Sequence, residues 1–127
     1  MEITLRDQIK LHFDKAGFGN PTFIFIHGGG GDTSHLAPQF YFFARRGTAI
    51  NLDLRGYGKS DKPIEYGTIA QYADDVVHLC RQLKITSPII IGHSMGGMVA
   101  VELAAKRPML PTAIVLISSG VLFPKRP

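Results

Sequence analysis

One serine of this chain lies between two glycines at a spacing that suits a nucleophile. The sequence Gly-His-Ser-Met-Gly runs from Gly92 to Gly96 and directly follows the isoleucines 89–91. A helical pattern begins after it, so Ser94 would lie on a tight turn between a strand and a helix. The backbone of such a turn is strained, and a Cβ at either flanking glycine would strike the neighbouring strand or helix. The pattern therefore predicts that Ser94 is a nucleophile rather than a structural serine.

A glycine-rich stretch supplies a second feature that acyl transfer needs. Four consecutive glycines follow His27, at the end of the apolar run Thr22–His27. Acyl transfer is favoured by two backbone N–H groups aimed at the developing oxyanion. We expect one from Met95, at the positive end of a helix, and the other from Gly29, where the backbone can approach a substrate closely. Four glycines alone would predict only a flexible turn, but together with Ser94 they predict an oxyanion hole.

Strand-like and helix-like segments alternate along the chain, and these elements must position the two motifs. Alternating branched and aromatic residues at positions 3–17 predict two early strands or a hairpin. Later strands are predicted at Thr22–His27, Gly47–Leu54, Ser87–Gly92 and Thr112–Ser119, the last of them buried on both faces.

Three helices are predicted between these strands. The first begins near Thr33 or Ser34 and runs to Ala44, and the third is Met95–Lys106, which Pro108 ends. The second begins after Thr68, which forms a capping box with Gln71, and it carries an apolar stripe with Asp74 and Asp75 on the other side. The alternation predicts one α/β domain: a mostly parallel sheet with flanking helices and an antiparallel N-terminal hairpin.

Composition narrows the class of protein. The 127 residues are 45% hydrophobic, enough for the core of one domain, and no apolar run approaches a membrane span. The charged N-terminus does not resemble a signal peptide. A lone cysteine, Cys80, excludes an internal disulfide and fits a reducing compartment, so we expect a cytoplasmic protein with a buried thiol. The net charge of +4 is scattered and no aromatic residues interleave with it, so we expect no nucleic-acid partner and no membrane partner.

Two nucleotide-binding interpretations of the glycines fail on spacing. The sequence GYGKS resembles the end of a phosphate-binding P-loop, but Asp53 stands where that motif needs glycine. The dinucleotide pattern G-x-G-x-x-G fails as well, because its last glycine would fall on Thr33 or Ser34.

Three motifs in order carry a family resemblance. The segments HGGGG, DLRGYGKSDKP and GHSMGG resemble the N-terminal half of an α/β-hydrolase, in the branch of esterases, proline iminopeptidases and C–C bond hydrolases. The resemblance covers essentially all of residues 1–127. It implies a nucleophile at Ser94, oxyanion donors at Gly29 and Met95, a small-molecule carbonyl substrate and no cofactor. The residues that support these motifs would be His27, Gly28, Gly92, His93 and Gly96, while Asp53, Arg55, Gly56 and Gly58 would shape a nearby loop.

The family's triad continues with an acid and then a histidine. No acidic residue follows Glu102 in this chain, and no histidine follows His93. The residues up to Pro127 resemble the strand after the nucleophile helix and the start of a segment that leads to a cap. We therefore expect a truncated domain. None of the five histidines (His12, His27, His35, His78, His93) is expected to serve as the base, and Asp53 and Asp61 are expected to fix loops.

The predicted function is that of a serine hydrolase acting on an ester, amide or related carbonyl compound. Transferase, haloperoxidase or C–C hydrolase chemistry could use the same residues. The alternative is a non-catalytic fragment that binds a ligand or a partner chain. Because Thr112–Ser119 would form an exposed sheet edge, we expect self-association or a second chain at this strand.

Overall fold

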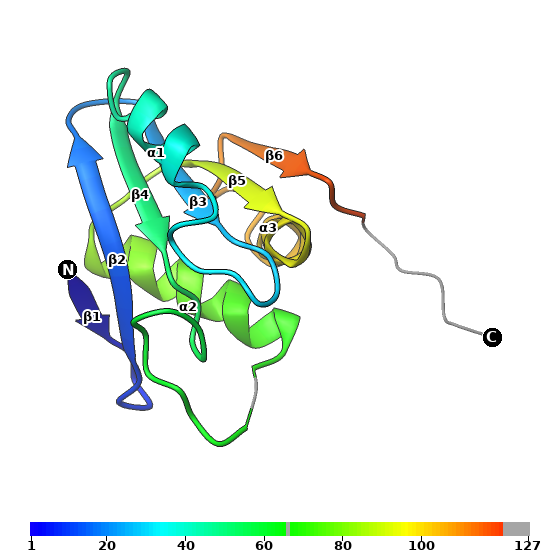
Figure 1. The fold of residues 1–127 in the computed structure, drawn as a ribbon. Coiled ribbons are helices and arrows are strands. Elements are labelled where there is room, and N and C mark those ends of the chain that lie inside the picture. Colours follow the sequence, from blue (N-terminus) through cyan, green and yellow to red (C-terminus); the bar gives the residue numbers. More distant parts are fainter. Residues whose placement is uncertain (66, 121–127) are drawn as a thin grey trace.

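A six-stranded sheet forms the centre of the computed structural model, which describes residues 1–65 and 67–120 (Figure 1). Along the chain the elements are β1 (Glu2–Thr4), β2 (Lys10–Gly17), β3 (Thr22–Ile26), α1 (Ala37–Phe43), β4 (Thr48–Leu52), α2 (Ile69–Gln82), β5 (Ile89–His93), α3 (Met95–Lys106) and β6 (Ala113–Ile117). The predicted alternation of strands and helices is confirmed.

The sheet has the order β1-β2-β4-β3-β5-β6. The strand β2 pairs antiparallel with β1 and with β4, whereas β4, β3, β5 and β6 run parallel. Ile24 lies beside both Ile50 and Ile90 in this register. Because parallel strands end at one edge of the sheet, the segments that follow β3, β4 and β5 meet there.

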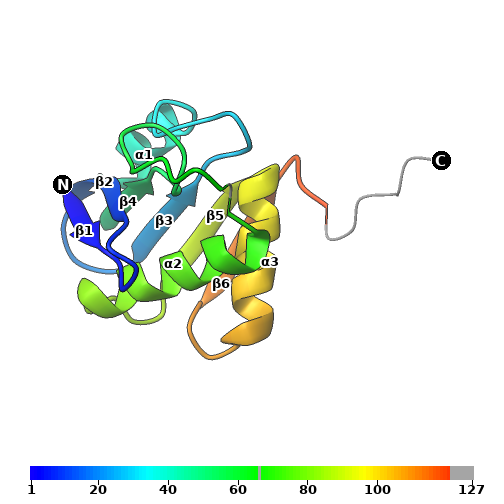
Figure 2. The same cartoon turned by 90° about the horizontal axis from the view of Figure 1, so that it is seen from below.

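The helices cover the two faces of the sheet unequally. Figure 2 shows α2 and α3 on one face and α1 on the other. Right-handed crossovers explain this arrangement. The chain moves along the sheet in one direction from β3 to β4 and in the opposite direction from β4 to β5 and β6. A right-handed connection therefore places α1 on one face and α2 and α3 on the other. No helix in residues 1–65 and 67–120 is long and apolar enough to cross a bilayer.

Alternate side chains of β3 pack into two separate hydrophobic clusters, one on each face of the sheet. Ile24 and Ile26 are buried in the larger cluster, which also contains Leu79 of α2 and Leu103 of α3. Phe25 belongs to the smaller cluster on the α1 face, where its ring lies 6.4 Å from that of Phe40. A strand buried on both faces needs the continuous apolar run that the sequence shows.

The helix α1 begins at Ala37, later than predicted. Turns occupy the preceding residues, where the Gly31 N–H donates to Gly28 O and the His35 N–H donates to Asp32 O. By contrast, α2 begins as predicted, because Thr68 Oγ1 accepts a hydrogen bond from the Gln71 N–H at 3.1 Å.

The prediction that the last strand is buried on both faces is wrong. In β6, Val115 is 43% exposed and Leu116 is 37% exposed. The strand lies at the edge of the described sheet, where β5 is its neighbour on one side and α1 does not reach over it. The predicted start of a cap segment, after Gly120, lies outside the described residues.

Candidate active site

Ser94 lies on a strained turn between β5 and α3. Its backbone has φ 51° and ψ −114°, in a region that non-glycine residues rarely adopt, at a cost of about 1–3 kcal/mol. The end of β6 holds this turn. The Ser94 N–H donates to Ile117 O at 2.9 Å, and the Ser119 hydroxyl donates to Ser94 O at 2.8 Å. This is the tight turn between a strand and a helix that the sequence pattern predicts for Ser94.

Both glycines that flank the turn are required by close backbone packing. A Cβ on Gly92 would overlap the backbone of Gly96, and a Cβ on Gly96 would overlap the carbonyl oxygen of Ile26. These are the collisions with helix and strand that the sequence pattern predicts.

The glycine loop after β3 lies against this turn. A Cβ built on Gly28 would be 3.3 Å from the Ser94 Cβ, and one built on Gly29 would be 3.7 Å from the Met95 Sδ. The structure therefore brings together the residues predicted for the nucleophile and for the oxyanion hole.

The orientation of the Gly29 N–H is set by the carbonyl of Gly28. That carbonyl accepts hydrogen bonds from the Gly31 N–H at 3.0 Å and from His27 Nδ1 at 2.7 Å. In a trans peptide the carbonyl and the next N–H point in opposite directions. Because both donors lie on the side of Gly28 O, the Gly29 N–H points to the opposite side of the peptide. There it can donate a hydrogen bond to a ligand.

Met95 is the first residue of α3, so its N–H has no carbonyl one turn earlier in the helix. Within residues 1–65 and 67–120, neither the Met95 N–H nor the Gly29 N–H donates to another group. Two unengaged donors beside a hydroxyl, one of them at a positive helix end, suit a developing oxyanion.

His27 holds the glycine loop in position through hydrogen bonds of its ring. It is fully buried, and its Nε2 accepts a hydrogen bond from the Leu54 N–H at 3.0 Å. Its proton is therefore on Nδ1, which donates to Gly28 O. Burial lowers the pKa of His27, although the hydrogen bond to Gly28 O and the nearby Asp53 and Asp32 oppose that shift. The lowered pKa favours the neutral ring that these two hydrogen bonds require.

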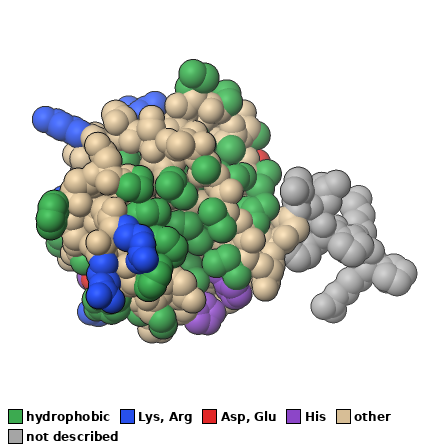
Figure 3. Space-filling model, turned by 90° about the horizontal axis from the view of Figure 1, so that it is seen from above, with side chains coloured by type: hydrophobic (Ala, Val, Ile, Leu, Met, Phe, Trp, Pro, Cys, Tyr) green, Lys and Arg blue, Asp and Glu red, His purple; other side chains and the backbone are tan. Residues whose placement is uncertain are grey.

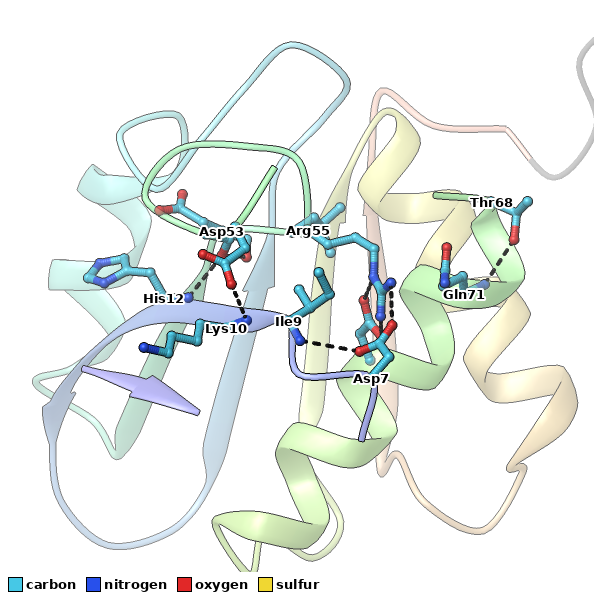
Figure 4. A network of polar contacts seen from close by, with 12 residues as sticks. Asp7, Ile9, Lys10, His12, Asp53, Arg55, Thr68 and Gln71 are labelled. Carbon is cyan, nitrogen blue, oxygen red and sulfur yellow. Dashed lines mark hydrogen bonds and ion pairs between the residues drawn. The ribbon is translucent and has the colours of Figure 1, made fainter. Parts of the chain in front are cut away.

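Asp53 ties the glycine loop to the loop that follows β4. One carboxylate oxygen accepts from the Thr33 N–H at 2.7 Å, and the other accepts from the Lys59 N–H at 2.9 Å. Gly58 makes this possible, because a Cβ there would overlap the Asp53 carboxylate. Asp61 fixes the same loop to β2 through the Lys10 N–H at 2.8 Å (Figure 4). In the structure, both aspartates fix loops.

Arg55 belongs to a buried ion network. Its guanidinium binds Asp75 through two hydrogen bonds, at 2.7 and 2.8 Å, and binds Asp7 at 2.8 Å (Figure 4). The Asp75 hydrogen bonds raise the pKa of Arg55 above its ordinary value, against the effect of its burial. The network joins the loop after β4 to α2 and to the turn after β1.

The placement of Asp75 on the solvent side of α2 is wrong, because it is 4% exposed. Helical spacing could have revealed this: Asp75 lies three residues after Tyr72 and four before Leu79, on the buried stripe.

The four other histidines contact residues other than Ser94. The His93 and His35 rings are 5.6 Å apart, whereas His12 contacts Asp14, and His78 contacts Gln82. Within residues 1–65 and 67–120, no histidine hydrogen-bonds the Ser94 hydroxyl, and His93 Nδ1 is buried without a partner.

The chain is similar to known proteins in sequence and in fold. The model of the alpha/beta hydrolase fold family matches residues 21–125. The chain is 35% identical to the dihydrolipoyllysine-residue acetyltransferase component of the acetoin cleaving system of Cupriavidus necator, over 88% of this chain and 30% of that protein. It is 36% identical to 2-(acetamidomethylene)succinate hydrolase of Mesorhizobium japonicum, over 87% of this chain and 39% of that one.

A solved esterase structure is also similar to this chain. A thermophilic esterase from Thermogutta terrifontis superposes with a TM-score of 0.90 at 28% identity, over 100% of this chain and 47% of the esterase. The chain belongs to the α/β-hydrolase fold family, and its named relatives include hydrolases and esterases. It spans between 30% and 47% of the length of these three proteins.

Proposed function

We propose that this chain carries the nucleophile and the oxyanion hole of a serine hydrolase that acts on an ester, amide or related carbonyl compound. The observation that supports this most directly is the strained backbone of Ser94, with φ 51° and ψ −114°, beside two unengaged backbone N–H groups. Strain at a polar residue between a strand and a helix has a cost that a structural serine would not need.

In the proposed reaction the Ser94 hydroxyl attacks the substrate carbonyl while a histidine base removes its proton. The resulting oxyanion is held by the N–H groups of Gly29 and Met95. The intermediate then collapses, and the leaving group departs with the proton from the base. Water attacks the acyl-serine in the second half of the reaction and releases a carboxylic acid.

The acid and the base belong, in this proposal, to sequence outside this chain. The family places both after the serine. Three of the described histidines hydrogen-bond other groups, and the rings of His35 and His93 contact each other. The chain alone would then be catalytically incomplete, because loss of triad residues lowers turnover by about 10⁴ to 10⁶. The buried, lone Cys80 supports a cytoplasmic location for the protein.

The competing proposal is a non-catalytic protein that binds a ligand or partner through the same site. It is favoured by the lack of any histidine on the Ser94 hydroxyl among residues 1–65 and 67–120. The choice between water and another acyl acceptor likewise depends on parts that surround the site.

A chimera tests the proposal. Residues 1–120 are joined to the second half of the Thermogutta terrifontis esterase, which is expected to supply the acid and histidine, and the folded protein is treated with a fluorophosphonate probe. We expect stoichiometric labelling that Ser94→Ala abolishes and that Ser34→Ala, at an exposed serine, leaves unchanged. A folded chimera without labelling would favour the binding role.

A further inference from the structure

A polar groove runs along α2, on the face of the sheet opposite α1. It has a volume of about 420 Å³ and is lined by the turn that joins β1 to β2, by one side of α2 and by the end of α3. The α2 residues that line it include Gln71, Asp74, His78 and Arg81, which are three or four positions apart and therefore share one side of the helix. A hollow of this size is within the range of sites that hold small molecules.

Several side chains that line the groove are buried. Leu5 and Val77 supply apolar surface, and Arg55 is held by Asp75 and Asp7 beside them (Figure 4). A groove with such walls has a lower local dielectric than an open surface. A charge at its rim therefore attracts an ion of opposite sign more strongly there.

Three arginines border the groove without a carboxylate partner. Arg6 comes from the turn between β1 and β2, Arg81 from the last turn of α2, and Arg107 from the residue after α3. All three are exposed, and in the described part of the chain none of them forms an ion pair. On the opposite face, by contrast, lysine and arginine side chains lie at scattered positions around a hydrophobic centre (Figure 3).

The aspartates of the groove already have cationic partners. Asp75 and Asp7 both bind Arg55, at 2.7 and 2.8 Å, and Asp74 lies 3.7 Å from Lys106. The lining contains four arginines and three aspartates, so it carries an excess of positive charge even with its histidine neutral. The groove therefore favours an anion over a cation or a neutral molecule.

We propose that this groove binds a small organic anion that carries two or more carboxylate or phosphate groups. Guanidinium groups bind both kinds of oxyanion through paired hydrogen bonds. Asp74 lies beside Lys106, the neighbour of Arg107, and Arg81 is seven residues further along α2, which is about 10 Å of helix. An anion with separated acidic groups can bind at both places, whereas one with a single acidic group cannot.

The groove is separate from the site at Ser94. Ser94 precedes the first residue of α3 and Arg107 follows the last, so about 18 Å of helix lies between them. None of the residues that line the groove belongs to the Ser94 turn or to the glycine loop. The inference therefore does not depend on the proposed function.

Calorimetry tests the groove with two probes, citrate and pyrophosphate, each titrated into the full 127-residue chain at neutral pH. We expect saturable 1:1 binding of at least one probe, and at least tenfold weaker binding of acetate, which has one acidic group. Tighter binding of citrate would assign a polycarboxylate ligand, and tighter binding of pyrophosphate would assign a phosphate-bearing one.

Substitutions locate the bound anion. Arg81→Gln and Arg107→Gln should each weaken binding at least tenfold, because each removes a guanidinium from the rim. Arg45→Gln is the matched control: it removes an exposed arginine just after α1, on the opposite face, and should leave binding unchanged. Circular dichroism of each variant verifies that weaker binding does not reflect unfolding.

The inference is overturned if neither probe binds saturably, if acetate binds as tightly, or if both Arg81→Gln and Arg107→Gln bind like the unchanged chain. Amide NMR spectra supply an independent check, since the probe should shift the resonances of Arg6 and Arg81 and not that of Gly29. Shifts confined to the glycine loop would place the anion at the other site and contradict the inference. Ser94→Ala should bind the probe unchanged, whether or not Ser94 is a nucleophile.

Discussion

At Gly96 the backbone of α3 passes so close to β3 that a single methyl group would not fit. We predict that Gly96→Ala destabilises the fold by about 3 kcal/mol, because the new Cβ would overlap the carbonyl oxygen of Ile26. Urea unfolding measures the loss. Gly29→Ala is the matched control, since its nearest contact would be the Met95 Sδ at 3.7 Å, and it should change stability by less than about 0.5 kcal/mol. Equal effects of the two substitutions would contradict the packing argument.

The neutral ring of His27 predicts a pH dependence of stability. Burial lowers the pKa of His27 below its ordinary value of 6.5, so the unfolded chain binds this proton more readily than the folded one. The contribution is complete above pH 6.5 and is lost as the pH falls below that value. We expect the free energy of unfolding, measured by urea titration, to decrease from pH 7.5 to pH 5.

Substitution assigns that decrease to one residue. His27→Gln should flatten the pH dependence, and His78→Gln, at a half-buried position of α2, serves as the control. An unaltered slope in His27→Gln would show that other groups cause the acid destabilisation.

Between elements, the strongest polar connection is the pair of Arg55 and Asp75. We predict that Asp75→Ala lowers the free energy of unfolding by about 3 kcal/mol, because Arg55 is 6% exposed and would keep only the hydrogen bond to Asp7. Asp74→Ala is the matched control on the same helix: Asp74 is 69% exposed and lies 3.7 Å from Lys106, so its loss should change stability by less than about 0.5 kcal/mol. Chemical denaturation of the two variants compares them directly.

For the whole molecule, stability should be distributed unevenly across the sheet. The strands β3 and β4 have hydrogen-bonded neighbours on both sides, whereas β6 lies at the described edge. We predict that amides of Ala113–Ile117 exchange with solvent about 100-fold faster than those of Thr22–Ile26. Hydrogen exchange read by mass spectrometry measures this. Equal protection of both strands in the isolated chain would contradict the edge assignment.

Much of the fold could be predicted because its signals are local. The continuous apolar run of β3, the capping Thr68 and the helix after Ser94 each depend on neighbouring residues, and each was found where the sequence indicates. Strand boundaries shifted by a few residues, and α1 began later, because backbone hydrogen bonds in residues 28–35 favour turns over another helical turn.

The candidate site was predictable in its parts but not in its assembly. Spacing alone pointed to Ser94, to the glycine loop and to the Met95 N–H. Nothing in the sequence indicated that His27 fixes the Gly28 carbonyl, and thereby aims the Gly29 N–H, since these contacts also involve Leu54 of another strand segment. Long-range hydrogen bonds of this kind depend on how the strands pair.

By itself, the sequence determined the class of fold, the turn that carries Ser94 and the glycines that this turn requires. These features depend on backbone sterics within a few residues, which the residue types specify directly. Only the tertiary structure decided that Arg55 is the partner of Asp75 and that β6 is half exposed. Burial is a property of what packs against a residue, and the packing partner lies on another element, far away in the chain.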